Sequence, residues 1–135
     1  MNNLNTIDFS ECWHIQEAFQ KKVNAVLFNK SDDVHSRTKE YLLSLISESI
    51  ELLNECDWKL HRRKKGPINV DNLYVELIDI FKWWLNIALD WGLTPEKFYE
   101  VFCQKSAVVE QRWIDEQSDC FRGSELLGKN DIGDE

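Results

Sequence analysis

Apolar residues recur at spacings of three and four along most of the chain, the pattern typical of amphipathic α-helices. Interrupted by few Gly and Pro residues, this periodicity predicts four helices, at about residues 10–28, 34–60, 69–91 and 95–119. We expect Ser10 to cap the first helix, Asn69 or Asp71 the third, and Thr94 the fourth, with Pro95 in its first position. No segment of useful length alternates as a strand does. The chain is therefore predicted to be all-α, a four-to-five-helix antiparallel bundle.

The third predicted helix is apolar on almost every side. One wide face carries Leu73, Leu77, Ile80, Phe81, Trp84, Ala88 and Trp91. Glu76 lies beside Ile80, Trp83 and Ile87, where an unpaired carboxylate would be costly to bury, so it needs a partner such as a cation. A helix that is apolar nearly all round must be covered on both sides. We therefore expect a homodimer or homotetramer that buries surface around this helix.

Two pairs of acidic residues carry the candidate chemistry. Each pair is spaced i, i+3, so that both carboxylates of a pair point the same way: Glu48 and Glu51, then Glu76 and Asp79. If the second and third helices pack antiparallel, the two pairs can face each other. Four such oxygen donors would suit Mg²⁺, with Mn²⁺ as a substitute. A di-iron bundle would need two Glu-x-x-His pairs, and this chain has only Glu11 to His14.

Composition limits the classes of function. The chain has 135 residues and a net charge of −8, with an acidic segment at its C-terminal end. We assign residues 1–121 to one domain and 122–135 to an acidic, disordered tail. An acidic chain without a basic stripe disfavours stable nucleic-acid binding. We expect no membrane segment and no signal peptide, and hence a cytoplasmic location.

The two acidic pairs, separated by 24 residues, resemble the motifs of the all-α nucleoside triphosphate pyrophosphohydrolases, the MazG and dimeric dUTPase superfamily. Trp58-Lys59 between the pairs, and Lys105 and Arg112 after them, are most similar to the dimeric dUTPase branch. The resemblance covers residues 42–112, about half of the chain. Val109 stands where that branch has an Asn between the Lys and the Arg. The resemblance therefore leaves the base open: dUTP, another pyrimidine, or a purine such as dGTP.

This resemblance implies a reaction in which a nucleoside triphosphate and water give the monophosphate and pyrophosphate, in control of the nucleotide pool. It implies that Glu48, Glu51, Glu76 and Asp79 hold Mg²⁺. Glu48 would in addition orient and deprotonate the attacking water, as a general base. Lys105 and Arg112 stand two helical turns apart and would neutralise the outer phosphates.

Other features of the sequence keep two interpretations. Gln20 and Asn24 are spaced i, i+4 and could read a base edge, or they could be surface polar residues. Trp58 could stack on a base. The basic run at residues 62–65 is either a loop that closes on the triphosphate or a solvated turn. The alternative to an enzyme is a non-catalytic helical interaction or adaptor protein whose carboxylates lie on its surface.

Overall fold

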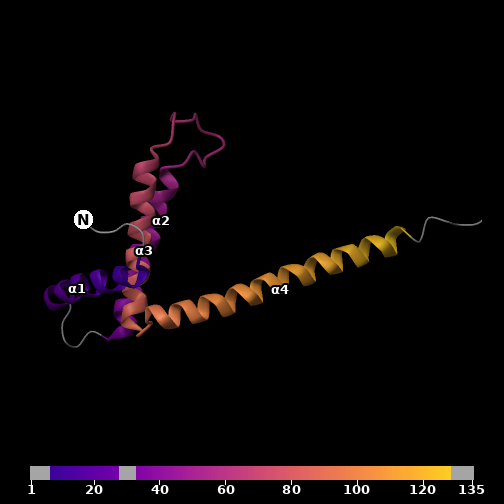
Figure 1. Ribbon diagram of the computed structural model, residues 1–135. Helices are drawn as coiled ribbons and strands as arrows, with labels where there is room; N and C mark the ends of the chain where they lie inside the picture. Colours follow the sequence, from indigo (N-terminus) through magenta and orange to yellow (C-terminus); the bar gives the residue numbers. More distant parts are fainter. Residues whose placement is uncertain (1–6, 28–32, 129–135) are drawn as a thin grey trace, which may run out of the picture. The chain divides into compact units, whose positions relative to one another are not determined.

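A computed structural model of the protein describes residues 7–27 and 33–128. These residues form four helices and no strand, which confirms the all-α prediction (Figure 1). The helices are α1 (Phe9–Leu27), α2 (Val34–Asn54), α3 (Val70–Asp90) and α4 (Pro95–Gly128). No helix in the described part of the chain combines the length and the apolar character needed to cross a bilayer.

Side chains just outside the helices cap their N-termini. Asp8 Oδ1 accepts a hydrogen bond from the backbone N–H of Ser10 at 2.9 Å, and α1 begins one residue earlier than expected. The prediction that Ser10 caps α1 is therefore wrong, because Asp8 supplies the accepting oxygen. Asp33 caps α2 through Ser36 N–H at 2.8 Å, and Asn69 caps α3 as predicted. Phe28, the expected end of α1, lies outside the described residues.

Two predicted helix ends are corrected by the structure. The second helix ends at Asn54 rather than at Leu60. In the loop beyond it, Asp57 Oδ1 accepts a hydrogen bond from the backbone N–H of Lys65 at 3.2 Å. The fourth helix continues to Gly128 instead of ending near Asp119. The first part of the expected tail is thus helical, and residues 129–135 lie outside the described range.

A glycine ends α3 and turns the chain toward α4. Gly92 has a φ of +74°, in the left-handed region that favours glycine. The N–H of Leu93 bonds to the carbonyl of Ala88 at 2.9 Å, and that of Gly92 bonds to Leu89 at 3.1 Å, a pair typical of the Schellman motif. The indole N–H of Trp13 in α1 then donates to the carbonyl of Leu93 at 3.0 Å. This turn therefore fixes α1 against the end of α3.

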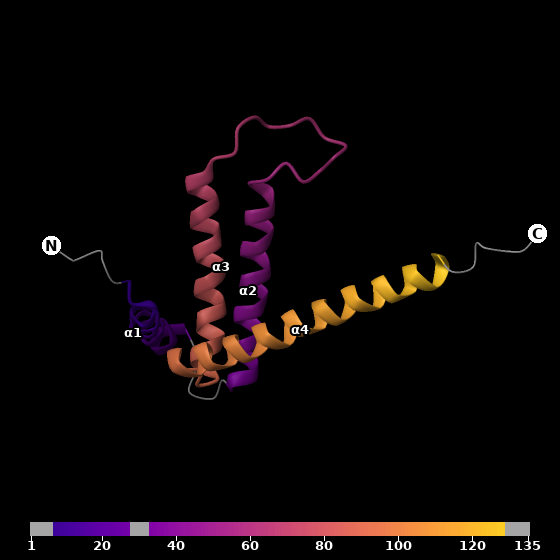
Figure 2. The ribbon, with the colours of Figure 1, turned by 45° about the vertical axis from the view of Figure 1, so that its right-hand side comes forward.

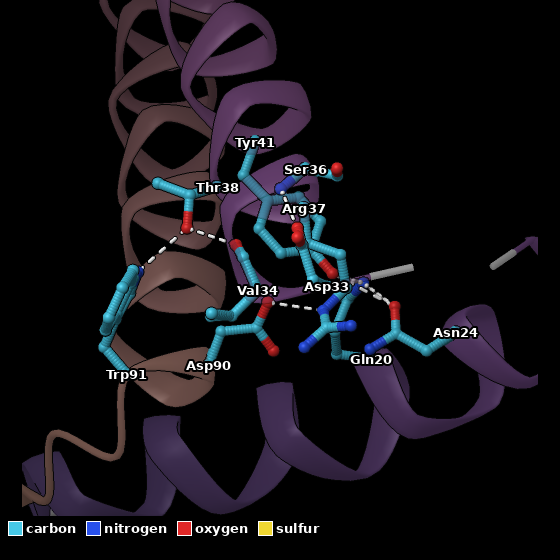
Figure 3. Close-up of polar contacts among 10 residues, drawn as sticks. All are labelled: Gln20, Asn24, Asp33, Val34, Ser36, Arg37, Thr38, Tyr41, Asp90 and Trp91. Carbon is cyan, nitrogen blue, oxygen red and sulfur yellow. Dashed lines mark hydrogen bonds and ion pairs between the residues drawn. The ribbon is translucent and has the colours of Figure 1, made fainter. Parts of the chain in front are cut away.

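The α2 and α3 helices form an antiparallel hairpin, as Figures 1 and 2 both show. At one end of the hairpin Arg37 Nε donates to Asp90 Oδ2 at 2.8 Å, in a partly buried ion pair, and Trp91 Nε1 donates to Thr38 Oγ1 (Figure 3). α1 packs against α3 through a cluster of aromatic rings: Phe9, Trp13, Phe81 and Trp84. These contacts hold α1, α2 and α3 together.

The chain divides into two compact units, residues 1–95 and 96–135. The first unit contains α1, α2 and α3 and carries the buried apolar side chains Trp13, Tyr41, Leu85 and Ala88. The second unit contains α4 after its first residue. A single helix forms no core of its own, so its apolar side chains, such as Phe102 and Trp113, depend on other surfaces for cover.

Candidate metal and nucleotide site

Three carboxylates meet between α2 and α3. Glu48 comes from α2, and Glu76 and Asp79 come from successive turns of α3. One oxygen of each lies within 4.8 Å of the others, and all three side chains are half-buried. The i, i+3 spacing on α3 and the antiparallel hairpin thus bring together three of the four residues expected to bind a metal.

Glu51, the fourth residue expected to bind the metal, is exposed and is not one of the three carboxylates grouped within 4.8 Å. Its charge nevertheless raises the pKa values of both Glu48 and Glu76, so Glu51 acts on the group electrostatically. Glu55, one turn further along, raises the pKa of Glu76 as well. The acidic surface of α2 therefore extends beyond the three grouped side chains.

The cluster lacks compensation for its negative charge. Burial is the main cause that raises the pKa of Glu76, and the charges of Glu51, Asp79 and Glu48 raise it further. Burial also raises the pKa of Glu48, against a hydrogen bond from Trp83 that lowers it. Glu76 Oε2 is buried and has no hydrogen-bond partner in the described part of the chain, where no Lys or Arg pairs with the three carboxylates either.

This donor set fits a divalent cation. Carboxylate oxygens are the ligands that Mg²⁺ and Mn²⁺ take in proteins, and Mg²⁺ binds through a few carboxylates while keeping sites for phosphate oxygens. A cation near Glu76 Oε2 would provide the partner that this buried oxygen lacks. It would also offset the repulsion that raises the two glutamate pKa values.

A cavity of about 750 Å³ lies beside the carboxylates, among α1, α2 and α3. Glu48 and Asp79 form part of its wall, so the cavity opens onto the acidic cluster. Its volume falls within the range of small-molecule sites, roughly 300–1,000 Å³. Among the residues that line it are Gln16, Gln20, Tyr41, Lys82, Trp83 and Asn86.

Two buried amides in this cavity were not found from the sequence. Gln16 Nε2 donates to Asn86 Oδ1 at 2.8 Å, and their exposed fractions are only 4% and 3%. The bond leaves Gln16 Oε1 as an acceptor and Asn86 Nδ2 as a donor. Two signals were present in the sequence: Gln16 lies one turn before Gln20, and Asn86 lies two turns after Asp79.

Gln20 and Asn24, the amides proposed from the sequence to read the base, bind each other and Tyr41. Gln20 Nε2 donates to Asn24 Oδ1 at 2.8 Å and to the Tyr41 hydroxyl at 2.9 Å, and that hydroxyl donates to Asn24 Oδ1 at 3.0 Å (Figure 3). Gln20 lines the cavity, whereas Asn24 does not. The bonds use both N–H groups of Gln20 and leave its carbonyl oxygen for a ligand.

The remaining predicted residues lie elsewhere in the chain. Trp58 belongs to the loop between α2 and α3, is about half exposed, and packs under the ammonium of Lys59, which lies 5.1 Å from the ring centroid. It does not line the cavity of about 750 Å³. Lys105 and Arg112 are exposed on α4, in the second unit, so their binding to phosphate stays a prediction.

The fold is that of an all-α protein in which a carboxylate cluster lies beside an amide-lined cavity, an arrangement that suits a small ligand and a cation. A model of a protein family described as dUTPase matches residues 8–127. The chain therefore belongs to this all-α dUTPase-like family, as its motifs predicted, and membership indicates a nucleotide pyrophosphohydrolase. Neither a comparison with curated proteins nor one with solved structures gives a match.

Crowding of the carboxylates predicts how Glu76→Gln changes stability. Glu48 and Glu76 hold protons more tightly in the folded chain than in the unfolded one, so the free energy of unfolding falls as pH rises from the ordinary value of 4.5 through their raised pKa values. In metal-free protein at pH 7, Glu76→Gln should raise the melting temperature and flatten its dependence on pH. Calorimetry across this pH range measures both effects.

The control for this experiment is Glu116→Gln, which removes an acidic charge from α4, outside the cluster. It should leave the pH dependence unchanged. Adding Mg²⁺ should stabilise the unmodified protein more than it stabilises the Glu76→Gln variant. A ligand at a hundred times its dissociation constant raises the free energy of unfolding by about 2.7 kcal/mol. If the melting temperature of the Glu76→Gln variant at pH 7 is below that of the unmodified protein, repulsion among the carboxylates does not destabilise the fold.

Proposed function

We propose that the protein hydrolyses a nucleoside triphosphate to the monophosphate and pyrophosphate, in a reaction that depends on Mg²⁺. The observation that carries this proposal is the position of the carboxylate cluster at the wall of the cavity, where Glu48 and Asp79 belong to both. A base bound in the cavity would place its triphosphate beside the carboxylates. Family membership supports the same chemistry.

In this proposal Glu76 and Asp79 hold the cation, with Glu51 and Glu48 completing the set from α2. When bound, Mg²⁺ withdraws charge from the α-phosphorus and makes it more open to attack by water. Glu48 orients that water and accepts its proton.

Recognition of the outer phosphates is assigned to Lys105 and Arg112. α4 is continuous from Pro95 to Gly128, so these two side chains stand two turns apart on one face of one helix. An arginine can bind phosphate through two parallel hydrogen bonds, whereas a lysine acts as a point charge. Because every nucleotide carries the same phosphates, neither side chain can select a base.

Selection of the base is assigned to the amides of the cavity. The Gln16–Asn86 pair offers an acceptor beside a donor, which complements a base edge with an N–H next to a carbonyl oxygen. Uracil and guanine both have such an edge, so dUTP and dGTP are both candidates. The carbonyl oxygen of Gln20 adds a second acceptor on the same wall. Stacking of Trp58 on the base, and closure of the basic residues 62–65 on the triphosphate, stay predictions.

The first prediction from this function concerns turnover. Asp79→Asn removes one charge from the cluster without changing its shape, and hydrolysis should fall by at least about 100-fold, the loss typical of a removed charge-stabilising group. The measurement is release of pyrophosphate, distinguished from orthophosphate, over a panel of eight triphosphates that includes dUTP and dGTP. Circular dichroism should show an unchanged helical fold.

Two results would argue against the enzyme. Full turnover in Asp79→Asn would remove this residue from the site. No hydrolysis of any triphosphate by the unmodified protein, together with no change in melting temperature on adding Mg²⁺ and a non-hydrolysable nucleotide, would favour the non-catalytic interaction protein.

A second prediction separates the base from the phosphates. Asn86→Asp keeps the oxygen that binds Gln16 and replaces the free donor by an acceptor. It should change the ratio of kcat/KM between bases by about 10-fold or more, because a two-point contact to a base edge is worth about 1–3 kcal/mol of discrimination. Lys105→Ala and Arg112→Ala should instead weaken all triphosphates alike. Equal losses for every base in Asn86→Asp would place base recognition elsewhere.

We also propose that the protein is a homodimer or homotetramer that buries apolar surface of α2 and α3. Several large apolar side chains on that hairpin are about half exposed: Leu43, Ile46 and Ile50 on α2, and Tyr74, Val75 and Ile78 on α3. Single exposed apolar residues are normal, but this number of them on two helices favours further burial, as between copies of the chain. The apolar side chains of α4 add further surface that needs cover.

Sedimentation tests this assembly. The unmodified protein should sediment as a dimer or tetramer at micromolar concentration. Val75→Glu replaces one of the exposed apolar side chains of α3 by a charge and should weaken association by roughly 30-fold or more, the effect of losing about 2 kcal/mol at an interface. Lys21→Glu, on an exposed side chain of α1 rather than of the hairpin, is the control. A compact monomer of the unmodified chain would overturn the proposal.

A further inference from the structure

Trp83 contacts both the cavity and the metal cluster. Its side chain is half-buried on α3 and forms part of the cavity wall. Its indole Nε1–H donates to Glu48 Oε1 at 3.4 Å, across the interface between α3 and α2. Trp83 thus provides a neutral hydrogen-bond donor to the carboxylate cluster, and it comes from the helix that also carries Glu76 and Asp79.

The ring of Trp83 is held in place by its neighbours. Tyr41 packs against it with a distance of 6.0 Å between ring centroids and an interplanar angle of 37°. Tyr41 is itself almost fully buried, with an exposed fraction of 2%, and its hydroxyl is bound to Gln20 and Asn24. Since the hydroxyl of Tyr41 is fixed by two amides, its ring limits the positions that the indole of Trp83 can take.

We propose that Trp83 is a positioning residue for Glu48: its N–H holds one carboxylate oxygen and leaves the other for the cation and the attacking water. This inference rests on the proposed function. A carboxylate at a metal site needs such a partner, because without one it can rotate or bind the cation through both oxygens. The bond is long for an N–H···O bond, and such bonds commonly shorten when a ligand completes the site.

The test replaces only the donor. Trp83→Phe keeps an aromatic ring beside Tyr41 and removes the N–H. Loss of a group that orients a metal ligand typically weakens metal affinity or activity by roughly 10–100-fold. Because the bond from Trp83 is long, we expect a loss of about 10-fold, at the lower end of this range. We expect weaker binding of Mn²⁺ without nucleotide, measured by electron paramagnetic resonance, and a lower kcat with little change in KM for the triphosphate.

A matched control lies on the same stretch of chain. Trp91→Phe removes an indole N–H that donates to Thr38 Oγ1 at 2.8 Å, at the other end of the hairpin and outside the cluster. If both variants lower the melting temperature but only Trp83→Phe weakens Mn²⁺ binding, the effect is one of position rather than of stability. Equal Mn²⁺ affinity in Trp83→Phe and the unmodified protein would overturn the inference while leaving the proposed function intact.

A double-mutant cycle tests whether Trp83 acts through Glu48. In a chain that already carries Glu48→Gln, adding Trp83→Phe should cause no further loss of Mn²⁺ affinity. Additive losses would show that Trp83 acts by another route, against the inference. If the unmodified protein binds no Mn²⁺ at all, both the proposed function and this role of Trp83 are wrong. Should Trp83→Phe fail to fold, Trp83→Leu, which keeps an apolar side chain and has no donor, takes its place in the same measurements.

Discussion

Three carboxylates of like charge are held together between α2 and α3, and contacts elsewhere in the first unit keep these two helices packed against each other. The Arg37–Asp90 ion pair and the Trp91–Thr38 bond join the two helices at one end of the hairpin. The carboxylates of Glu48, Glu76 and Asp79 meet further along it. The contacts at the Arg37–Asp90 end therefore hold α2 and α3 together, whereas repulsion among the carboxylates acts to separate them. A site that opposes folding locally and is compensated elsewhere is typical of functional sites.

The sequence predicted the acidic cluster well because helical spacing alone determines most of it. Glu76 and Asp79 are three residues apart, so they share a face of α3 whatever else the chain does. The placement of Glu48 needed one further step, the antiparallel packing of two consecutive amphipathic helices. Glu51 marks the limit of this reasoning, because its spacing from Glu48 does not place its carboxylate in the group of three.

Contacts between distant residues could not be predicted in this way. The Gln16–Asn86 bond joins positions that are 70 residues apart, and neither amide has a local reason to be buried. Helix ends failed for a different reason. Asp8 and Ser10 are both good caps, and the choice between them depends on backbone geometry rather than on residue type. The end of α2 depends on the loop at Asp57 and Lys65, where a side chain binds the backbone eight residues away.

The packing of the cavity wall connects the residues proposed to select the base with the carboxylate cluster. A triphosphate is common to all nucleotides, so a cluster that grips it needs a separate device to distinguish one base from another. Here the amides of α1 are connected to the cluster through side chains in direct contact: Gln20 binds Tyr41, Tyr41 packs on Trp83, and Trp83 bonds to Glu48. Because packed side chains have few alternative positions, a ligand that displaces Gln20 or Tyr41 must also move the group that holds Glu48. A base that fits this wall would therefore leave Glu48 aligned, whereas one that distorts the wall would disturb the carboxylate proposed to act as the base in hydrolysis.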